Sequence, residues 1–282
     1  MKANSIWTQE ISSEFSRQPA GKIEELLELM TFSKENKIDQ FINDISLYDN
    51  PIFSKWIYST DCHELNDIKR ELQIKIARSR HVDDIQQSQL LRAIGILSTS
   101  KTVGIDFENP SAFFIYNQQG FIQACREYLK NEDESDFIDD MLFCFPNLYF
   151  HPSVKTSLHT LNRNFRDIRN EIIVHLTALD DYCKKFLEMT YEHKGYREMA
   201  AAFQKDTHIE CSPQASRDHV KSLKYSFTNT ITNQTEEITC ELHTKFRKHN
   251  INRQKQDRIY FAPPRPEILD GKVIIVHIGA HL

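Results

Sequence analysis

The residue types best suited to binding and transforming phosphate groups gather in the closing third of this 282-residue chain. Residues 243–265 contain seven Lys or Arg side chains and a single acid, Asp257, and seven of the 12 histidines follow residue 190. The whole chain has a formal net charge of -5, which disfavours nonspecific binding of nucleic acid by the entire surface. The local excess of positive charge makes this segment the candidate site.

Alternation of apolar and polar residues predicts that the same segment forms strands. Runs at 223–227, 238–246, 258–261 and 272–279 have a period near two and are joined by short links, which predicts an antiparallel β-meander. Successive side chains of a strand point to opposite faces, so the apolar sets are expected to pack on helices and the polar sets to share the other face. That polar face would carry Glu241, His243, Lys245, Arg247, Arg258, Tyr260 and His277.

These residue types suit metal-independent cleavage of RNA. The predicted catalytic residues have three roles: Glu241 or His243 takes the proton of a 2′-hydroxyl, His277 protonates the leaving oxygen, and Lys245 and Arg258 stabilise the phosphate in the transition state. The predicted nucleic-acid-binding residues are Arg247, Lys248, Arg253 and Tyr260, the last by stacking on a base. This chemistry requires no cofactor and no metal. The ordinary alternative is a solvated polar sheet face.

The closing strands also resemble a known family. The run Cys240-Glu-Leu-His-Thr-Lys, the segment Arg258-Ile-Tyr-Phe and the final Val273-Ile-Ile-Val-His-Ile-Gly are similar to the last three strands of the RelE/ParE toxin superfamily. The resemblance covers about residues 221–282 and implies a small α/β domain that cleaves RNA without metal. Positions matching the family's functional residues would be Lys245 or Arg247, Arg258, and His277 or His281. That family lacks a large helical domain.

A second candidate site lies in the helical part of the chain. Arg169 and His175 are separated by five residues, which resembles the R-x4-6-H signature of HEPN ribonucleases and implies an RNA-cutting site at a helical dimer interface. The ordinary alternative is a buried polar residue that fixes helix register. The pairs His208/Cys211 and Cys240/His243 have zinc-like spacing, but strand residues three apart face opposite sides, so no metal site is predicted.

Residues from about 20 to 190 show the spacing of amphipathic helices, at 22–31, 36–48, 61–76, 83–98, 111–130 and 135–145. From Pro152 to about His193 the apolar residues alternate in steps of four and three, which predicts one long heptad helix. Such a helix packs along its own bundle, or along a second copy or another partner protein. Seven glycines and no Gly-rich phosphate loop disfavour a nucleotide-binding fold.

We therefore expect an α+β protein: an all-α bundle at 1–190 for assembly or regulation, followed by a basic α+β domain with a β-meander at 196–282. No apolar run reaches the roughly 18 residues that span a bilayer, and the sequence shows no secretory pattern, so a cytoplasmic location without membrane contact is expected. Six scattered cysteines are typical of reduced thiols.

Three functional hypotheses remain open at this point. The first is a toxin- or phage-defence-type protein whose C-terminal sheet binds RNA and cleaves it by transesterification. The second is a non-enzymatic assembly or sensor subunit of a multi-protein defence complex, which docks as a homodimer or on a partner through the 152–190 helix. The third is a HEPN-like ribonuclease that uses Arg169 and His175.

Overall fold

The chain folds into two compact units, Met1–Glu132 and Asp133–Leu282, here called the N-terminal and C-terminal units. The predicted division at 190–196 does not coincide with this boundary, because the helices of residues 134–207 pack with the closing strands. The computed structural model describes residues 3–7, 14–36, 39–44, 48–60, 63–82, 84–96, 101–215, 220–247 and 256–282.

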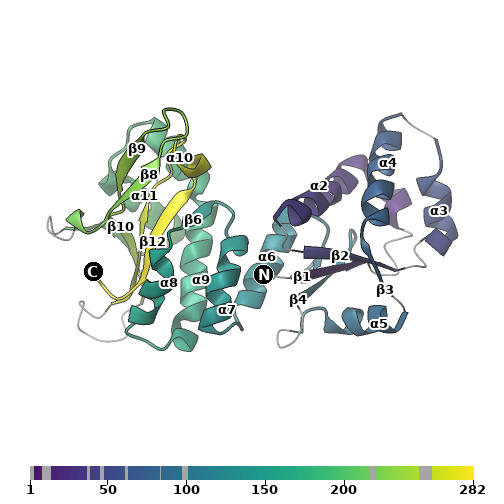
Figure 1. Ribbon diagram of the computed structural model, residues 1–282, viewed down its shortest axis with the longest axis horizontal. Helices are drawn as coiled ribbons and strands as arrows, with labels where there is room; N and C mark the ends of the chain where they lie inside the picture. Colours follow the sequence, from purple (N-terminus) through teal and green to yellow (C-terminus); the bar gives the residue numbers. More distant parts are fainter. Residues whose placement is uncertain are drawn as a thin grey trace. The chain divides into compact units, whose positions relative to one another are not determined.

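The N-terminal unit contains a five-stranded parallel sheet in the order β3-β2-β1-β4-β5. Its strands are β1 (Ala3–Trp7), β2 (Asp39–Asp44), β3 (Arg80–Val82), β4 (Lys101–Ile105) and β5 (Phe114–Ile115). The short 3-10 helix η1 (Phe15–Arg17) precedes the helices α2 (Ala20–Asn36), α3 (Pro51–Ile57), α4 (His63–Ala77), α5 (Asp84–Ala93) and α6 (Gln118–Leu129). Helices α2 and α4 lie on one side of the sheet and α5 lies on the other (Figure 1). The strand order is that of doubly wound α/β folds.

The all-α prediction for this part of the chain is wrong, because the unit contains a five-stranded sheet. Residues 36–48 have apolar side chains at helical spacing, yet residues 39–44 form β2. Parallel strands that are covered on both faces lack the alternation by which strands are recognised in a sequence. The helices α2, α4, α5 and α6 fall within or close to their predicted ranges.

The C-terminal unit contains a mixed five-stranded sheet in the order β6-β12-β11-β10-β7. Its strands are β6 (Leu148–Phe150), β7 (Cys211–Pro213), β10 (Leu242–Lys245), β11 (Arg258–Ala262) and β12 (Val273–Gly279). The last three are antiparallel neighbours, whereas β6 joins β12 in parallel, so the sheet is not a simple meander. Strands β8 (Lys224–Thr228) and β9 (Thr235–Thr239) form a separate two-stranded hairpin.

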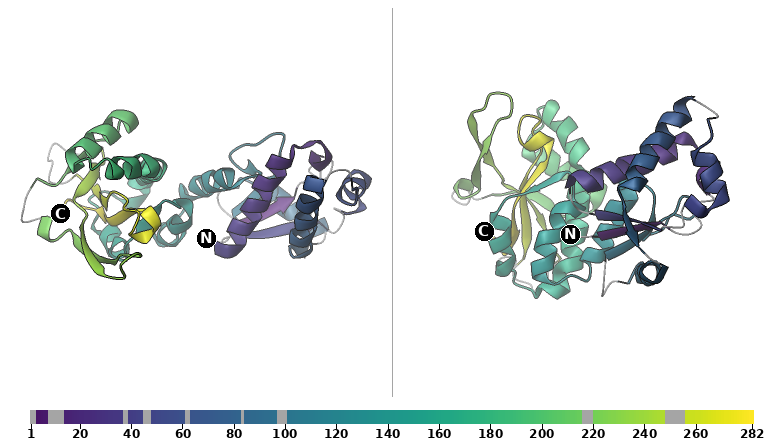
Figure 2. Two further views of the ribbon diagram at one scale, coloured as in Figure 1. Left: turned by 90° about the horizontal axis from the view of Figure 1, so that it is seen from above. Right: turned by 45° about the vertical axis from the view of Figure 1, so that its right-hand side comes forward.

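The two faces of this sheet have different coverings. The hairpin packs Leu223, Phe227 and Ile238 against one face, in an apolar cluster that includes Tyr260 and Val276. The helices α8 (Ser153–Ser157), α9 (Phe165–Asp181), α10 (Cys183–Tyr191) and α11 (Tyr196–Thr207) lie towards the other face, with α7 (Glu134–Cys144) beside them (Figures 1 and 2). We call these the hairpin face and the helix face.

The single long helix predicted from Pro152 to His193 is wrong. After α8 and the 3-10 helix η3 (Leu158–Thr160), the backbone leaves the helical region at Leu161, and the Asn164 side chain caps α9 by accepting from the Arg166 amide at 3.0 Å. A further break at Tyr182 separates α9 from α10. The heptad side chains Leu158, Phe165, Ile168, Ile172, Leu179 and Phe186 are buried inside the C-terminal unit. These side chains are therefore not available as a seam for a second chain.

Within the described ranges, no helix has both the length and the apolar character needed to cross a membrane.

Gly279 is predicted to tolerate no side chain, because α8 and η3 press against the end of β12. A Cβ atom at this position would overlap the backbone carbonyl oxygen of Ser157 and the Thr160 hydroxyl. The Ser157 and Thr160 side chains also accept from the amides of Ile278 and Ala280, at 2.9 and 3.1 Å, which holds the two segments together. We expect Gly279→Ala to lower the free energy of unfolding by about 1–3 kcal/mol in urea titrations.

The matched control is Gly21→Ala in α2, where an added Cβ meets nothing within 4 Å. This change should leave stability unchanged or raise it, because Ala has the higher helix propensity. Equal effects of the two substitutions would contradict the proposed crowding at Gly279.

Candidate functional site

The strand register brings two predicted catalytic histidines and a tyrosine into one row. His243 on β10 pairs with Tyr260 on β11, and Tyr260 pairs with His277 on β12. The ring centroids of His243 and Tyr260 are 4.9 Å apart, and those of Tyr260 and His277 are 5.6 Å apart. We call these three residues the His–Tyr–His row. They lie on the hairpin face, where alternation places His243 and Tyr260 and a β-bulge beside Tyr260 places His277, and they are buried instead of solvated.

Arg258 lies beside this row and is the residue that most constrains its chemistry. Its Nη1 atom donates to His243 Nε2 at 3.1 Å and to the Tyr260 hydroxyl at 3.4 Å. The residue is only 8% exposed, and its Nε atom has no hydrogen-bond partner. Among the described residues, no carboxylate lies within ion-pair distance of the guanidinium group. Arg258 is therefore a buried cation without a described counter-charge.

His243 is held in its neutral form as a hydrogen-bond acceptor. Its Nδ1 faces the Glu241 carbonyl at 3.3 Å, so Nδ1–H donates there and the Nε2 lone pair accepts from Arg258. Burial first, and then the neighbouring Arg258 charge, lowers the pKa of His243 to about 3. A nitrogen that is already engaged and so weakly basic opposes the predicted role of His243 as a general base.

The remaining predicted catalytic residues are not arranged as an acid–base pair. His277 has Nε2 at 2.8 Å from the Ala280 carbonyl, and burial lowers its pKa. Lys245 forms an ion pair with Glu210 at 2.6 Å. The Glu241 side chain lines a separate hollow beside α11, where burial raises its pKa.

Ser212 on β7 is a member of the site that the sequence did not reveal. Its Oγ lies 3.2 Å from His243 Nε2, because β7 pairs with β10 and places Ser212 opposite His243. The run Cys211–Pro213 is too short, and its proline too atypical of strands, to signal a strand. The charges of Arg258, Lys245 and His281 lower the pKa of His243, whereas the negative charge of Asp257 acts to raise that of His277. The His–Tyr–His row together with Ser212 and Arg258 is here called the Arg258 site.

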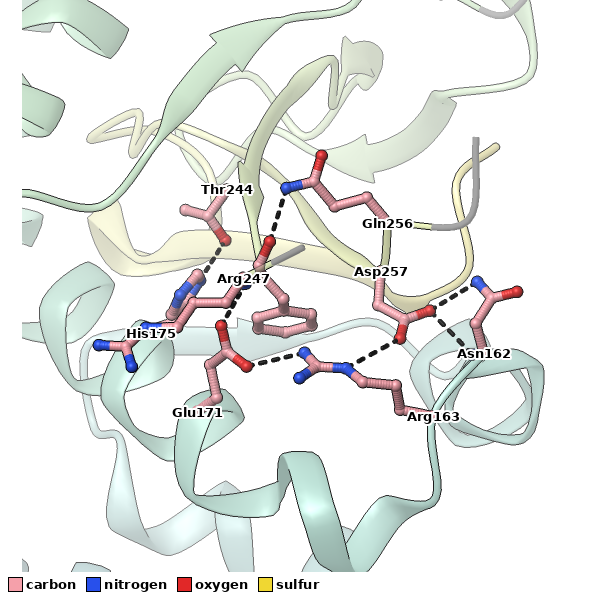
Figure 3. A network of polar contacts seen from close by, with 9 residues as sticks. Asn162, Arg163, Glu171, His175, Thr244, Arg247, Gln256 and Asp257 are labelled. Carbon is pink, nitrogen blue, oxygen red and sulfur yellow. Dashed lines mark hydrogen bonds and ion pairs between the residues drawn. The ribbon is translucent and has the colours of Figure 1, made fainter. Parts of the chain in front are cut away.

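The helix face of the same sheet carries a second polar network, which holds the two ends of the basic 247–257 segment (Figure 3). Asp257 Oδ1 accepts from the backbone and side-chain nitrogens of Asn162 at 2.9 and 2.8 Å. Arg163 donates to Glu171 at 2.7 Å and lies 3.9 Å from Asp257 Oδ2. Glu171 in turn accepts from the backbone amide of Arg247. These contacts anchor the segment to α9 and to the turn that precedes α9.

The predicted nucleic-acid-binding residues that the structure describes lie on different faces of the sheet. Tyr260 is fully buried within the row, so its ring is not a free stacking surface. Arg247 is exposed at the end of the helix-face network. Lys248 and Arg253 lie outside the described residues.

Arg169 and His175 do not form a shared site on α9. Six residues of an α-helix correspond to about 600° of rotation, so the two side chains point roughly 120° apart. His175 is buried, with Nδ1 at 2.9 Å from the Thr244 hydroxyl and its ring 4.6 Å from that of Phe246 (Figure 3). Burial, followed by the charges of Arg163 and Arg247, lowers the pKa of His175 to about 3. Its surroundings are those of a core histidine.

Comparison of the chain with family models, with curated proteins and with solved structures gave no match. In the part of the chain that the structure describes, no three His, Cys, Asp or Glu side chains are grouped to hold a metal ion. The Arg258 site is therefore characterised by its own geometry, as a buried guanidinium group that donates to His243 and Tyr260.

The two deeply buried histidines predict a loss of stability in acid. Both His175 and His243 have a pKa of about 3 in the fold, against about 6.5 when unfolded. Below pH 6.5 the unfolded chain binds more protons, so stability falls as the pH drops from 6.5 towards 3. At pH 5 each histidine should cost about 2 kcal/mol relative to neutral pH.

Urea titrations at pH 7.5 and 5 measure this loss in the parent protein and in two variants. His175→Asn and His243→Gln keep an acceptor near the original nitrogen but cannot be protonated, so each should reduce the loss. His159→Asn is the control, because that side chain is 70% exposed. A loss that stays undiminished in both variants would show that these histidines are not buried in their neutral form.

Replacement by methionine should change the unfolding free energy differently for an arginine that binds a ligand and for one that stabilises the fold. Arg258→Met removes a buried charge that has no described counter-charge, so the unfolding free energy should stay the same or rise. Arg163→Met deprives the buried Asp257 of its neighbouring cation and should lower the unfolding free energy by about 3 kcal/mol. Urea unfolding at neutral pH compares the two. A larger loss for Arg258→Met would mean that Arg258 is a structural residue.

Proposed function

We propose that the C-terminal unit binds RNA through a phosphate group placed against Arg258. The observation that carries this proposal is the guanidinium group of Arg258, which is buried without a described carboxylate partner. Leaving a charge unpaired in a protein interior costs several kcal/mol, and such charges are normally paired. A phosphate supplies the missing negative charge, and an arginine recognises it through directed hydrogen bonds.

The neighbours of Arg258 support a binding role in preference to a structural one. His243 and Tyr260 accept hydrogen bonds from Nη1, and the buried Nε–H group has no described acceptor, so an anion that reached it would satisfy it. Ser212 adds a hydroxyl on the other side of His243 Nε2. An arginine oriented by its own neighbours loses little conformational freedom when an anion binds.

Charge composition favours a localised contact over a broad basic surface. The sequence of the C-terminal unit contains 20 Lys or Arg residues and 21 Asp or Glu residues. A unit with so little net charge attracts nucleic acid only where positive charge is concentrated, as it is along residues 243–265. Binding through few phosphates should therefore depend only weakly on salt concentration.

Binding is better supported than cleavage by the same site. Transesterification needs a base and an acid, and His243 and His277 are both neutral and already hydrogen-bonded. A sensor that binds RNA without cutting it is thus the second candidate, and the neutral histidines favour it. The assignment to toxin- or phage-defence-type proteins follows from the sequence resemblance alone and stays a prediction.

Replacement of Arg258 by glutamine is the direct test. Loss of a charge-assisted contact should weaken the binding of a fluorescently labelled RNA about tenfold or more in anisotropy titrations. The control is Arg265→Gln, a half-exposed arginine that pairs with Glu236 and Glu267 and should leave affinity unchanged. The same RNA, analysed on a denaturing gel after incubation, distinguishes a ribonuclease from a sensor.

Three outcomes decide the proposal. Weaker binding by Arg258→Gln alone supports it. Equal binding by the parent and Arg258→Gln places the RNA contact elsewhere, and an absence of RNA binding by the parent refutes the proposed function. Circular dichroism and thermal melting of both variants exclude unfolding as the cause.

A further inference from the structure

Strand β7 lies at the edge of the C-terminal sheet, so one side of its backbone faces away from the other strands. Among the described strands, β7 pairs with β10 alone. The Gln214 amide donates to the Glu241 carbonyl at 2.9 Å. Backbone groups alternate in direction along an antiparallel strand, so those of Ser212 and Gln214 face β10, whereas those of Cys211 and Pro213 face outward.

The outer side of β7 offers one donor and two acceptors to an incoming chain. The Cys211 amide donates to the side-chain oxygen of Gln204, an exposed residue of α11, over a long 3.3 Å. Among the described residues, no group donates to the carbonyl oxygens of Cys211 and Pro213. Pro213 has no amide hydrogen, which limits any pairing to a short segment and disfavours extended edge-to-edge association. A short strand can therefore pair here once the Gln204 side chain moves aside.

Two hollows lie along this edge, between β7 and α11. The first has a volume of about 380 Å³ and is lined by all three residues of β7. The second has a volume of about 420 Å³ and extends past Pro213 to Gln214. They share Arg197 and Pro213, so we treat them as one groove and call it the β7 groove. Each hollow has the size of a small-ligand pocket.

The two ends of the β7 groove carry opposite charges. Lys205 lines the end at Cys211, where no acidic side chain is present, and Glu198 and Glu241 line the other end, with Arg197 between them. Within the described ranges, Arg197 and Lys205 form no ion pair, and the Glu241 carboxylate accepts no hydrogen bond. An extended chain advances about 3.3 Å per residue, so the ends lie about three residues apart.

We infer that the β7 groove binds an extended segment of a partner protein, which adds to the five-stranded C-terminal sheet as a further strand. The backbone of this segment pairs with Cys211 and Pro213. An acidic side chain or a terminal carboxylate of the segment lies against Lys205, and a lysine or arginine three or four residues away lies against Glu241. In such strand addition the backbone hydrogen bonds provide affinity and the side chains select the sequence. This inference is independent of RNA binding at Arg258.

A display library of random decapeptides, selected on the immobilised full chain, supplies the probe. Enriched peptides should contain Lys or Arg three or four residues from an acidic residue or a free carboxyl end. The most enriched peptide, labelled with a fluorophore, is then titrated by anisotropy. Lys205→Gln and Glu241→Gln should each weaken its binding about threefold or more. The matched controls Lys184→Gln and Glu188→Gln, at exposed positions of α10, should leave its affinity unchanged.

An N-methyl scan of the same peptide tests the strand pairing. Only alternate amides of an added strand face its neighbour, so two amides separated by one residue would donate to the carbonyl oxygens of Cys211 and Pro213. Methylation of either should weaken binding about tenfold, whereas methylation of the residue between them should have little effect.

Three results would overturn the inference. Selection that enriches no peptide refutes a peptide site on this chain. Enriched peptides that bind the parent, Lys205→Gln and Glu241→Gln equally well occupy another surface. A peptide that depends on both charges but shows no alternation in the N-methyl scan is bound through its side chains, which refutes strand addition. Circular dichroism of each variant excludes unfolding as the cause of weaker binding.

Discussion

The antiparallel register of β10, β11 and β12 is the constraint on which the rest of the C-terminal unit depends. It sets His243, Tyr260 and His277 side by side on one face. Because side chains alternate along a strand, a slip of one residue in β11 would turn Tyr260 and Arg258 towards the helices and bring Ile259 and Phe261 to the hairpin face. The apolar packing of both faces therefore fixes the register, and the register in turn assembles the polar group. The arrangement of His243, Tyr260 and His277 therefore depends on the packing of the hydrophobic core.

Each face of the sheet has a buried charged side chain beside it, and the two side chains have different partners. On the helix face, the buried Asp257 receives two hydrogen bonds from Asn162 and has Arg163 nearby, so the charge has partners within the unit. On the hairpin face, Arg258 contacts only neutral groups, His243 and Tyr260. Asp257 and Arg258 are adjacent in the sequence, yet they carry opposite charges and lie on opposite faces. Asp257 has a cation near its Oδ2 atom and Arg258 has no described carboxylate near its guanidinium group, although each side chain keeps one buried atom without a hydrogen-bond partner. The functional proposal rests on this difference in counter-charge.

The sequence predicted the local periodicity of the C-terminal strands well and the long-range arrangement poorly. Alternation correctly placed His243, Arg258 and Tyr260 on one face, because the period of a strand is a local property. It did not predict the β-bulge that brings His277 to the same face as Ile274 and Val276, which it had set on the opposite face. It could not predict the burial of these polar residues, since the covering hairpin and residues 280–282 come from other segments. The heptad pattern of 152–190 was misread because apolar spacing does not reveal the break at Leu161 or the sheet beneath the helices. The parallel sheet of the N-terminal unit was missed because its strands lack the alternation of a half-buried strand, and because β3 and β5 have only three and two residues.

The place of β12 within its sheet has a consequence for how the protein acquires its fold. Strand β12 is formed by residues 273–279, yet it lies between β6, at residues 148–150, and β11. The helices α8 to α10 therefore leave the ribosome long before the strand that joins β6 to the rest of the sheet has been synthesised. Contacts between segments so distant in sequence form slowly, and until they form the backbone groups at the edges of β6 and β11 that pair with β12 remain unpaired. Completion of this unit is thus a late event in biosynthesis.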